Sequence, residues 1–368
     1  AGGVNMDKIL AAPGKYVQGP GTLDRLGEYV GKLGDKPLVI VDKNVMGFLG
    51  DRLTQVMAGQ LSPIMELFRG ESSRQEVMRL QELGANKANV VIGVGGGKTI
   101  DTAKAVAYYL KVPVAIVPTI AATDAPTSAL SVLYTEEGVF DEYLVLPANP
   151  DLVLVDTKII AAAPARFLAS GMGDALATYF EAEACAQSNA VATAGGTITL
   201  AARQLALLCF ETLMEYGEQA LWAAERHVIT PALEYIVEAN TLLSGLGFES
   251  GGLAAAHAVH NGFTALEETN VVFHGEKVAY STLVQMVLEG RSSEEIEEVM
   301  GFCIAVNLPV TLAQLGIKKP DPQRLMLVAE AATDPNETIH NMPFPVTAEM
   351  VRDAIIAVDA IGNALLGN

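Results

Sequence analysis

Four short and almost continuously apolar runs in the first 160 residues constrain the fold more than any other feature of the sequence. They occupy residues 38–41, 89–92, 114–117 and 152–155 and are rich in Val and Ile. Runs without polar alternation are typical of strands buried on both faces of a parallel sheet. Residues 73–84 and 99–110 lie between them and carry apolar side chains at helical spacing. This alternation predicts βαβ units.

The pattern changes beyond Pro164, where Ala, Leu, Glu and Met dominate long periodic stretches without comparable β-branched runs. We expect helices at 165–185, 195–215, 230–245, 251–265, 278–288, from 292 onward, and at 347–366. The sequence therefore predicts two domains. Residues 1–160 form an α/β domain with a Rossmann-like parallel sheet, and residues 161–368 form an all-helical domain. A cleft between the two halves is the expected ligand site.

Composition excludes several classes of protein. Half of the 368 residues are hydrophobic and 18% are charged, so the chain has enough apolar surface to fold. The 43 acidic and 24 basic residues give a net charge of −19, which repels phosphate backbones. We therefore expect neither a nucleic acid nor an anionic membrane as partner.

The cysteines and the beginning of the chain indicate a cytoplasmic protein. Cys185, Cys209 and Cys303 are far apart, form no CxxC pair, and are expected to be reduced thiols packed as small hydrophobes. No apolar stretch approaches the ~18 residues of a membrane span. The first eight residues contain no hydrophobic core of a signal peptide.

A glycine-rich turn at residues 93–99 follows the second apolar run and opens a predicted helix. Glycines allow close backbone approach, and a helix N-terminus directs free N–H groups at an anion. The turn fits neither a Walker loop, which needs glycine where Ile92 stands, nor the common dinucleotide fingerprint, which needs glycine at Lys98. A plain tight turn is the alternative. Three consecutive glycines are unfavourable for a mere turn, so the sequence favours phosphate binding.

Asp42 ends the first apolar run, where its carboxylate can accept hydrogen bonds from a ribose diol. A carboxylate at this place favours NAD over NADP, because a 2′-phosphate would meet a like charge. A helix-capping aspartate is the alternative interpretation.

Three of the five histidines, His257, His260 and His274, fall within eighteen positions of one another. Polar side chains in such apolar stretches need partners, and imidazoles with a carboxylate are zinc ligands. The chain has no HExxH motif, which excludes a zincin protease. Spacing alone does not select which histidines bind a metal.

Several motifs together resemble the glycerol dehydrogenases, a branch of the iron-containing alcohol dehydrogenase superfamily that typically uses zinc. The Gly-x-Gly-Gly-Gly-Lys-x-x-Asp-x-x-Lys turn at 93–104 marks the superfamily, and 123–132, 173–178 and 247–265 are more specific to the branch. The likeness runs from Pro13 almost to the C-terminus and implies a dehydroquinate synthase-like architecture.

The resemblance also implies roles for individual residues. Asp174, His257 and His274 are similar to metal ligands for Zn²⁺, with Fe²⁺ as the alternative, and Thr178 stands where some relatives have a fourth ligand. Asp124 is similar to a glycerol-contacting residue, and His260 is either a proton relay or a structural histidine. Ala122 replaces a serine common in the family. The expected NAD contacts are Asp42, Gly95, Gly96, Gly97, Lys98, Thr119, Ala122, Ser128, Leu130 and Tyr134.

The implied activity is NAD-dependent oxidation of glycerol, or of a related vicinal diol, by metal-assisted hydride transfer in a homo-octamer. One alternative is a superfamily member with a phosphorylated substrate, such as a glycerol-1-phosphate dehydrogenase or a dehydroquinate synthase-like enzyme. A phosphorylated substrate needs a cluster of basic side chains in the helical domain. Between Asp174 and His274 the only arginines or lysines are Arg203 and Arg226, which disfavours that alternative. A catalytically silent NAD-binding scaffold is the other alternative, and the intact metal-ligand set disfavours it.

Overall fold

The computed structural model describes residues 7–367, so residues 1–6 and 368, the outer ends of the two predicted domains, lie outside the described residues. The chain divides into two compact units. The α/β unit contains Ala12–Pro164 and the short segment Arg226–Ile229. The helical unit contains Ala165–Glu225, the chain from Thr230 onward, and the described residues up to Ala11. The Ala11 N–H donates to Ser250 Oγ at 2.9 Å, which ties this first segment to the helical unit.

The α/β unit is built on a parallel six-stranded sheet with the order β1-β8-β5-β4-β2-β3. The four apolar runs form its interior strands, which confirms that part of the prediction. The strands are β1 (Tyr16–Gly19), β2 (Pro37–Asp42), β3 (Ile64–Phe68), β4 (Val90–Gly95), β5 (Val114–Pro118) and β8 (Leu152–Asp156). The sequence pattern did not predict the edge strands β1 and β3, because they are half-buried and mix polar with apolar residues.

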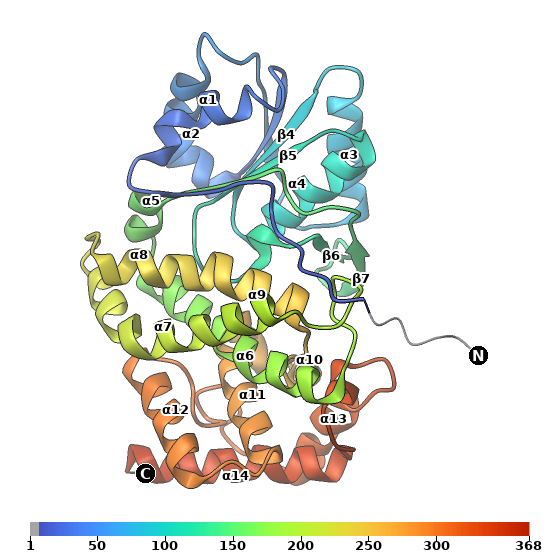
Figure 1. Cartoon of the computed structure of the whole chain (residues 1–368), viewed down its shortest axis with the longest axis vertical. Helices are drawn as coiled ribbons and strands as arrows, with labels where there is room; N and C mark the ends of the chain where they lie inside the picture. Colours follow the sequence, from blue (N-terminus) through green and yellow to red (C-terminus); the bar gives the residue numbers. More distant parts are fainter. Residues whose placement is uncertain (1–6, 368) are drawn as a thin grey trace. The chain divides into compact units, whose positions relative to one another are not determined.

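Helices cover both faces of this sheet (Figure 1). Leu26 and Val30 of α1 and the apolar stripe of α2 pack against β2 and β4 in one core. The helices of the unit are α1 (Leu26–Val30), α2 (Lys43–Met57), α3 (Arg74–Gly84), α4 (Gly97–Leu110) and α5 (Thr157–Ala162), with short 3₁₀ turns η1 (Thr22–Arg25) and η2 (Ala125–Thr127). A separate antiparallel hairpin, β6 (Leu130–Tyr134) and β7 (Phe140–Val145), follows β5.

The helical unit contains the remaining helices. They are α6 (Ala165–Ser188), α7 (Leu200–Glu225), α8 (Pro231–Glu238), the π-helical turn η3 (Ala239–Leu243), α9 (Ser244–Gly251), α10 (Ala255–Phe263), η4 (Glu267–Val271), α11 (His274–Leu288), α12 (Ser293–Ala305), α13 (Pro322–Ala332), η5 (Thr338–Asn341) and α14 (Ala348–Leu366). Within residues 7–367 this unit has no strand, and its one β contact is an isolated bridge between Lys8 and Thr197. The predicted fold class is therefore confirmed.

Some predicted helix boundaries are wrong. The expected helix at 251–265 is interrupted at Gly252, where φ is +104°, and α10 begins only at Ala255. Glycine is needed there for space as well, because a Cβ would lie 2.7 Å from Cys185 Sγ. The expected helix at 195–215 starts later and continues to Glu225. The expected helix at 230–245 runs on through η3 to Gly251.

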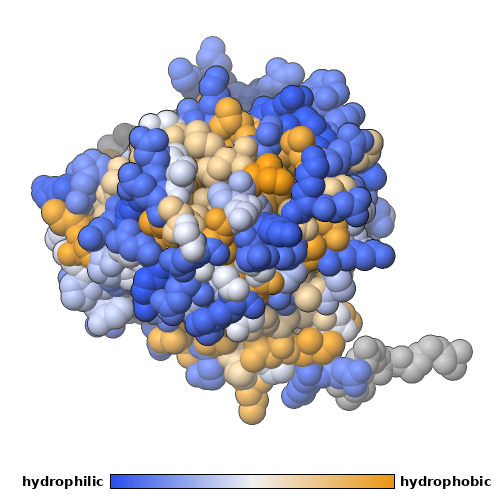
Figure 2. Space-filling model, turned by 90° about the horizontal axis from the view of Figure 1, so that it is seen from above, coloured by the Kyte–Doolittle hydropathy of each residue, from blue (hydrophilic) through white to orange (hydrophobic). Residues whose placement is uncertain are grey.

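The visible surface is largely polar. Figure 2 shows hydrophilic side chains over most of the visible face, with smaller hydrophobic patches between them. Within the described part of the chain, no helix is both long and apolar enough to cross a membrane. All three cysteines are buried thiols that form no disulfide, as predicted.

Candidate active site

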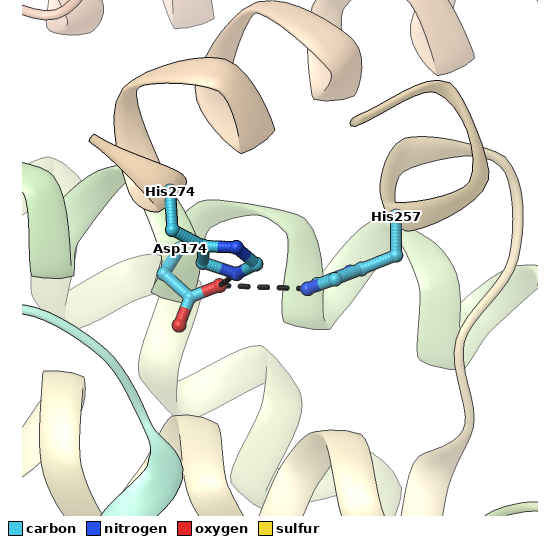
Figure 3. A group of neighbouring side chains, drawn as sticks. All are labelled: Asp174, His257 and His274. Atoms are coloured by element: carbon cyan, nitrogen blue, oxygen red, sulfur yellow. Dashed lines mark hydrogen bonds and ion pairs between the residues drawn. The ribbon is translucent and has the colours of Figure 1, made fainter. Parts of the chain in front are cut away.

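Three helices of the helical unit bring Asp174, His257 and His274 together (Figure 3). Asp174 lies in the middle of α6, His257 in the first turn of α10, and His274 is the first residue of α11. Asp174 Oδ1 is 3.1 Å from His274 Nε2 and 3.5 Å from His257 Nε2. One ligand atom from each residue lies within 4.8 Å of the others. Among the described residues, the three that the resemblance indicates form this group.

Glycines and small side chains allow these helices to approach closely. A Cβ on Gly173 would overlap the carbonyl oxygen of Gly275, and a Cβ on Gly275 would overlap the carbonyl oxygen of Ser170. The two glycines directly neighbour Asp174 and His274. The helices α6, α10 and α11 also contribute one residue each to a buried apolar cluster of Ala177, Ala256 and Val278. Close packing therefore places the ligand atoms within reach of one another.

Aromatic and ionic contacts fix the start of α11, where His274 lies. The Phe273 ring stacks on Phe167 with 5.1 Å between centroids, and the Arg166 guanidinium lies 4.3 Å from the centroid of the same ring. Glu276 accepts a 2.6 Å bond from the Phe273 N–H and a 2.7 Å bond from Arg166 Nε. These contacts join the first turn of α6 to the first turn of α11 and limit the freedom of His274.

The electrostatics of the group centre on its buried carboxylate. Burial raises the pKa of the Asp174 carboxyl, but His274 and His257 lower it more, so the pKa is held well below its usual range. Burial lowers the pKa of His257, but Glu181 and Asp174 raise it more, and the net pKa is raised. One carboxylate and two imidazoles are a donor set that fits Zn²⁺ or Fe²⁺. The hydroxyl of Thr178, which stands where some relatives have a fourth ligand, is hydrogen-bonded to Ser244 Oγ at 2.9 Å.

His260 lies beside this group, with its ring centroid 4.2 Å from that of His274. Its Nδ1 is 3.1 Å from Asn261 Oδ1, and Asn261 Nδ2 donates to both oxygens of Glu337 at 3.1 and 3.2 Å. Since the amide presents its oxygen to His260, Nδ1 carries the proton and Nε2 keeps a lone pair. Burial, together with His274 and His257, lowers the pKa of His260 well below its ordinary value. These contacts and this shift favour the neutral form of the His260 ring, with its proton on Nδ1.

The predicted dinucleotide residues lie in the α/β unit, around the carboxyl ends of β2, β4 and β5. The chain order of the strands reverses between β2 and β4, and such a switch point is where open α/β sheets bind ligands. Asp42 ends β2 and Gly95 ends β4. The Thr119 N–H donates to the Gly95 carbonyl at 3.1 Å. A Cβ on Gly95 would lie 2.8 Å from Thr99 Oγ1 and 3.1 Å from Asp42 Cβ, so the turn requires glycine.

The start of α4 has the properties expected of an anion site. Gly96 is its N-cap and Gly97 its first residue, so no capping side chain covers the first N–H groups. Asp42 is the N-cap of α2, and its Oδ1 accepts from the N–H groups of Asn44 at 2.8 Å and Val45 at 3.3 Å. Asp42 is therefore a helix-capping residue, as the alternative interpretation predicts. Both capping hydrogen bonds end on the same carboxylate oxygen.

The other predicted cofactor residues fall into smaller groups. Lys98 Nζ is 5.1 Å from the Tyr134 ring centroid and 2.6 Å from Glu71 Oε2. The buried Ser128 hydroxyl lies 3.3 Å from Lys104 Nζ, which also donates to the carbonyls of Ala125 and Leu130. Asp124 and Ala122 are partly buried and lie in the loop after β5.

Sequence reasoning missed two residues with clear structural roles. Lys104 is buried on α4 and binds Ser128 Oγ and the Leu130 carbonyl, which anchors that segment. Glu181 is fully buried on α6 and binds His257 through Nδ1 at 2.6 Å. An acidic residue seven positions after Asp174 in an apolar helix was the available signal, because residues at that spacing share one face.

Comparison with known proteins agrees with this architecture. The sequence profile of the iron-containing alcohol dehydrogenase family matches residues 13–157. A glycerol dehydrogenase from Pseudomonas putida is 56% identical over 98% of this chain and all of its own length. A glycerol dehydrogenase from Escherichia coli is 55% identical over 98% of this chain and 99% of its own.

A solved structure is similar as well. The crystal structure of glycerol dehydrogenase from Schizosaccharomyces pombe superposes with a TM-score of 0.95 at 42% identity, covering 98% of this chain and 93% of that one. The protein has a two-unit fold, a glycine turn at the switch point of the sheet, and an Asp-His-His group. Together these features indicate a protein of the dehydrogenase class. With this degree of identity along the whole chain, the protein belongs to the iron-containing alcohol dehydrogenases and, within them, to the glycerol dehydrogenases.

Proposed function

We propose that this protein oxidises glycerol to dihydroxyacetone with NAD⁺ as hydride acceptor, and that it also accepts related vicinal diols. The observation that carries the proposal is the group of Asp174, His257 and His274, in which one buried carboxylate faces two imidazoles. Identity to glycerol dehydrogenases along the full length of the chain supports glycerol as the substrate.

Asp174, His257 and His274 would hold the metal, which is Zn²⁺ in this proposal, with Fe²⁺ compatible with the same donors. When bound, the metal supplies Lewis acidity that eases removal of an alcohol proton, and NAD⁺ supplies the hydride acceptor. Three protein ligands leave a coordination position for substrate, as a catalytic site requires. The partial exposure of His274, whose side chain is 40% accessible, is consistent with that role.

The dinucleotide would be held by the residues around the switch point. The glycine turn at Gly95, Gly96 and Gly97 and the first N–H groups of α4 suit a pyrophosphate. Asp42 would accept hydrogen bonds from the ribose diol and would repel the 2′-phosphate of NADP. Further contacts are assigned to Lys98, Thr119, Ala122, Ser128, Leu130 and Tyr134, with Ser128 acting through its backbone because its hydroxyl faces Lys104.

Two residues would act on the substrate itself. Asp124, by its resemblance to the family position, would hold one hydroxyl of glycerol and so determine which carbon faces the nicotinamide. His260 would accept the alcohol proton at Nε2. Asn261 and Glu337 support that role, because their hydrogen bonds fix the proton of His260 on Nδ1.

We also propose that the protein is a cytoplasmic homo-octamer. The resemblance to glycerol dehydrogenases supports the octamer, and three buried thiols without a disulfide are compatible with a reducing compartment. Light scattering after size-exclusion chromatography tests the assembly. A mass well below eight chains would contradict the octamer and leave the catalytic proposal intact.

A substrate comparison tests the proposed reaction. Initial rates of NADH formation should give the highest kcat/KM for glycerol or another vicinal diol. Glycerol 1-phosphate should be a poor substrate, because the segment from Asp174 to His274 contains only two arginines, Arg203 and Arg226, and no lysine. A preference for the phosphorylated compound would overturn the proposal.

A further inference from the structure

The side chain of Glu181 connects two of the three elements that carry the metal-ligand group. It lies on α6, two turns after Asp174, and is completely buried. Its Oε1 accepts hydrogen bonds from the N–H of Ala254 at 2.8 Å and the N–H of His257 at 2.9 Å. Its Oε2 accepts from His257 Nδ1 at 2.6 Å. A single carboxylate therefore binds both the backbone and the ring of His257.

The backbone contacts explain why a buried acid is tolerated here. The first N–H groups of a helix need partners, and Ala254, the N-cap of α10, has no polar side chain to supply one. Glu181 of α6 supplies that acceptor, and Gln285 of α11 accepts from the N–H of Ala256 at 3.0 Å. The helix that carries His257 is thus capped by side chains of the two helices that carry Asp174 and His274. The carboxylate also lies at the positive end of α10.

The contact with the ring has a different consequence. A carboxylate only accepts hydrogen bonds, so the Nδ1 of His257 must carry the proton. In the neutral imidazole that metal binding requires, the lone pair is then on Nε2, the atom that lies 3.5 Å from Asp174 Oδ1. Carboxylates that bind the far nitrogen of a metal-ligating histidine fix both its orientation and its tautomer.

We propose that Glu181 is a positioning residue that directs the Nε2 lone pair of His257 to the metal. The inference rests on the proposed metal site. Glu181 then has two roles: it caps α10, and it selects the tautomer of His257. A near-isosteric amide separates them experimentally. Glu181→Gln retains an oxygen for the two backbone N–H groups but presents an NH₂ group to Nδ1, which drives the proton to Nε2.

The test measures Zn²⁺ affinity of metal-free protein by competition with a chromogenic chelator, and the visible absorption of the Co²⁺-substituted protein. Glu181→Gln should bind Zn²⁺ about 10–100-fold more weakly and change the Co²⁺ spectrum, while its thermal unfolding stays close to that of the wild type. Glu183→Gln is the matched control. It changes an acid on the same helix that pairs with Arg203 at the surface, so it should behave like the wild type.

The outcomes separate this inference from the proposed function. Unchanged Zn²⁺ affinity and an unchanged Co²⁺ spectrum in Glu181→Gln would overturn the role of Glu181 and leave the metal site standing. Equal Zn²⁺ affinity of wild type and Asp174→Asn would overturn the metal site, and this inference with it. Should Glu181→Gln fail to fold, solid-state NMR of ¹⁵N-histidine-labelled, zinc-loaded wild type decides instead. A proton on Nδ1 of His257 supports the inference, and a metal-bound Nδ1 overturns it.

Discussion

At the scale of single residues, the candidate site depends on a few side chains whose partners are defined. Asp174 is 1% exposed and faces two imidazoles. Because its negative charge is buried, it must be stabilised either by those rings or by a cation. His274 differs from its neighbours because its side chain remains partly accessible. The two residues therefore differ in their surroundings: Asp174 is a buried charge, and His274 is the member of the group nearest to solvent.

Replacing His274 by Ala should abolish turnover while leaving NAD⁺ affinity nearly unchanged. The expected kcat is lower by about 10³-fold or more, because a catalytic metal contributes several kcal/mol to the transition state. Steady-state rates and calorimetric NAD⁺ binding measure the two quantities. His340→Ala is the control, because His340 lies outside the group and its ring is hydrogen-bonded to the Asp334 carbonyl. Retained activity with lost NAD⁺ binding in His274→Ala would refute the assignment.

Replacing Asp42 by Ser should weaken the preference for NAD⁺ over NADP⁺. Ser keeps the N-cap of α2 and removes the charge that would repel a 2′-phosphate, so the fold should be preserved. The ratio of kcat/KM for NADP⁺ to that for NAD⁺ should rise about tenfold or more. Asp51→Asn removes an exposed charge from the same helix and should leave the ratio unchanged. An unchanged ratio in Asp42→Ser would contradict the ribose assignment.

The sequence predicted the ligand set only through resemblance, because spacing alone could not choose among His257, His260 and His274. Their arrangement depends on contacts between helices that are far apart in the chain. Glu181 and Lys104 were missed for the same reason. A buried acid or lysine in a helix can be recognised as unusual, but its partner is set by the packing of other elements, such as the approach of α10 to α6.

At the scale of elements, the group is assembled by helices that meet at glycine. Gly173 on α6 and Gly275 on α11 leave no room for a Cβ on either side. Gly173 directly precedes Asp174, and Gly275 directly follows His274. The spacing of the two helices therefore sets the distance between Asp174 and His274. Any side chain at these positions must displace backbone rather than a flexible group.

Replacing Gly275 by Ala should destabilise the protein and weaken metal binding together. The added methyl meets the Ser170 carbonyl, and overpacking of this kind typically costs about 1–3 kcal/mol. Chemical unfolding and Zn²⁺ competition measure the two effects. Gly301→Ala on α12 is the control, because nothing lies within 4 Å of its Cβ position, and it should be neutral or stabilising. Wild-type Zn²⁺ affinity in Gly275→Ala would contradict the dependence on helix spacing.

Elements were predictable where one local signal dominated. The strands β2, β4, β5 and β8 are buried on both faces and read as continuous apolar runs. Edge strands β1 and β3 lack that signal, and the space that requires glycine at position 252 is limited by Cys185, which the local pattern of 251–265 does not contain. The fold class was therefore predictable, while several boundaries were not.

At the scale of the whole molecule, stability should depend on a buried acid in the α/β unit. Burial raises the pKa of Asp101 to about 6, although Lys104 opposes the shift. Between pH 4 and 6 the folded chain therefore holds a proton that the unfolded chain has released. The stability that this proton contributes is present below the unfolded pKa and is lost as the pH rises through about 6.

Replacing Asp101 by Asn should remove this pH dependence. Relative to wild type, the variant should gain up to about 3 kcal/mol between pH 4 and pH 7, since one pKa unit corresponds to about 1.4 kcal/mol. Urea unfolding of both proteins across that range measures the difference. A difference that is constant with pH would show that Asp101 titrates normally.

The change of pattern at Pro164 predicted an α/β fold followed by helices, and both parts are observed. The location of the ligand site in a cleft between the two halves stays a prediction, as does the octamer. Neither follows from local periodicity, because each depends on surfaces contributed by distant parts of one chain or by several chains.

The most direct test of the account is NADH formation from glycerol and NAD⁺, followed by absorbance, before chelation, after chelation and after restoration of Zn²⁺. The account predicts activity that disappears with the chelator and returns with Zn²⁺, because Asp174, His257 and His274 hold a metal that the reaction needs. Activity that survives complete removal of the metal, or its absence in the zinc-loaded protein, would contradict the account.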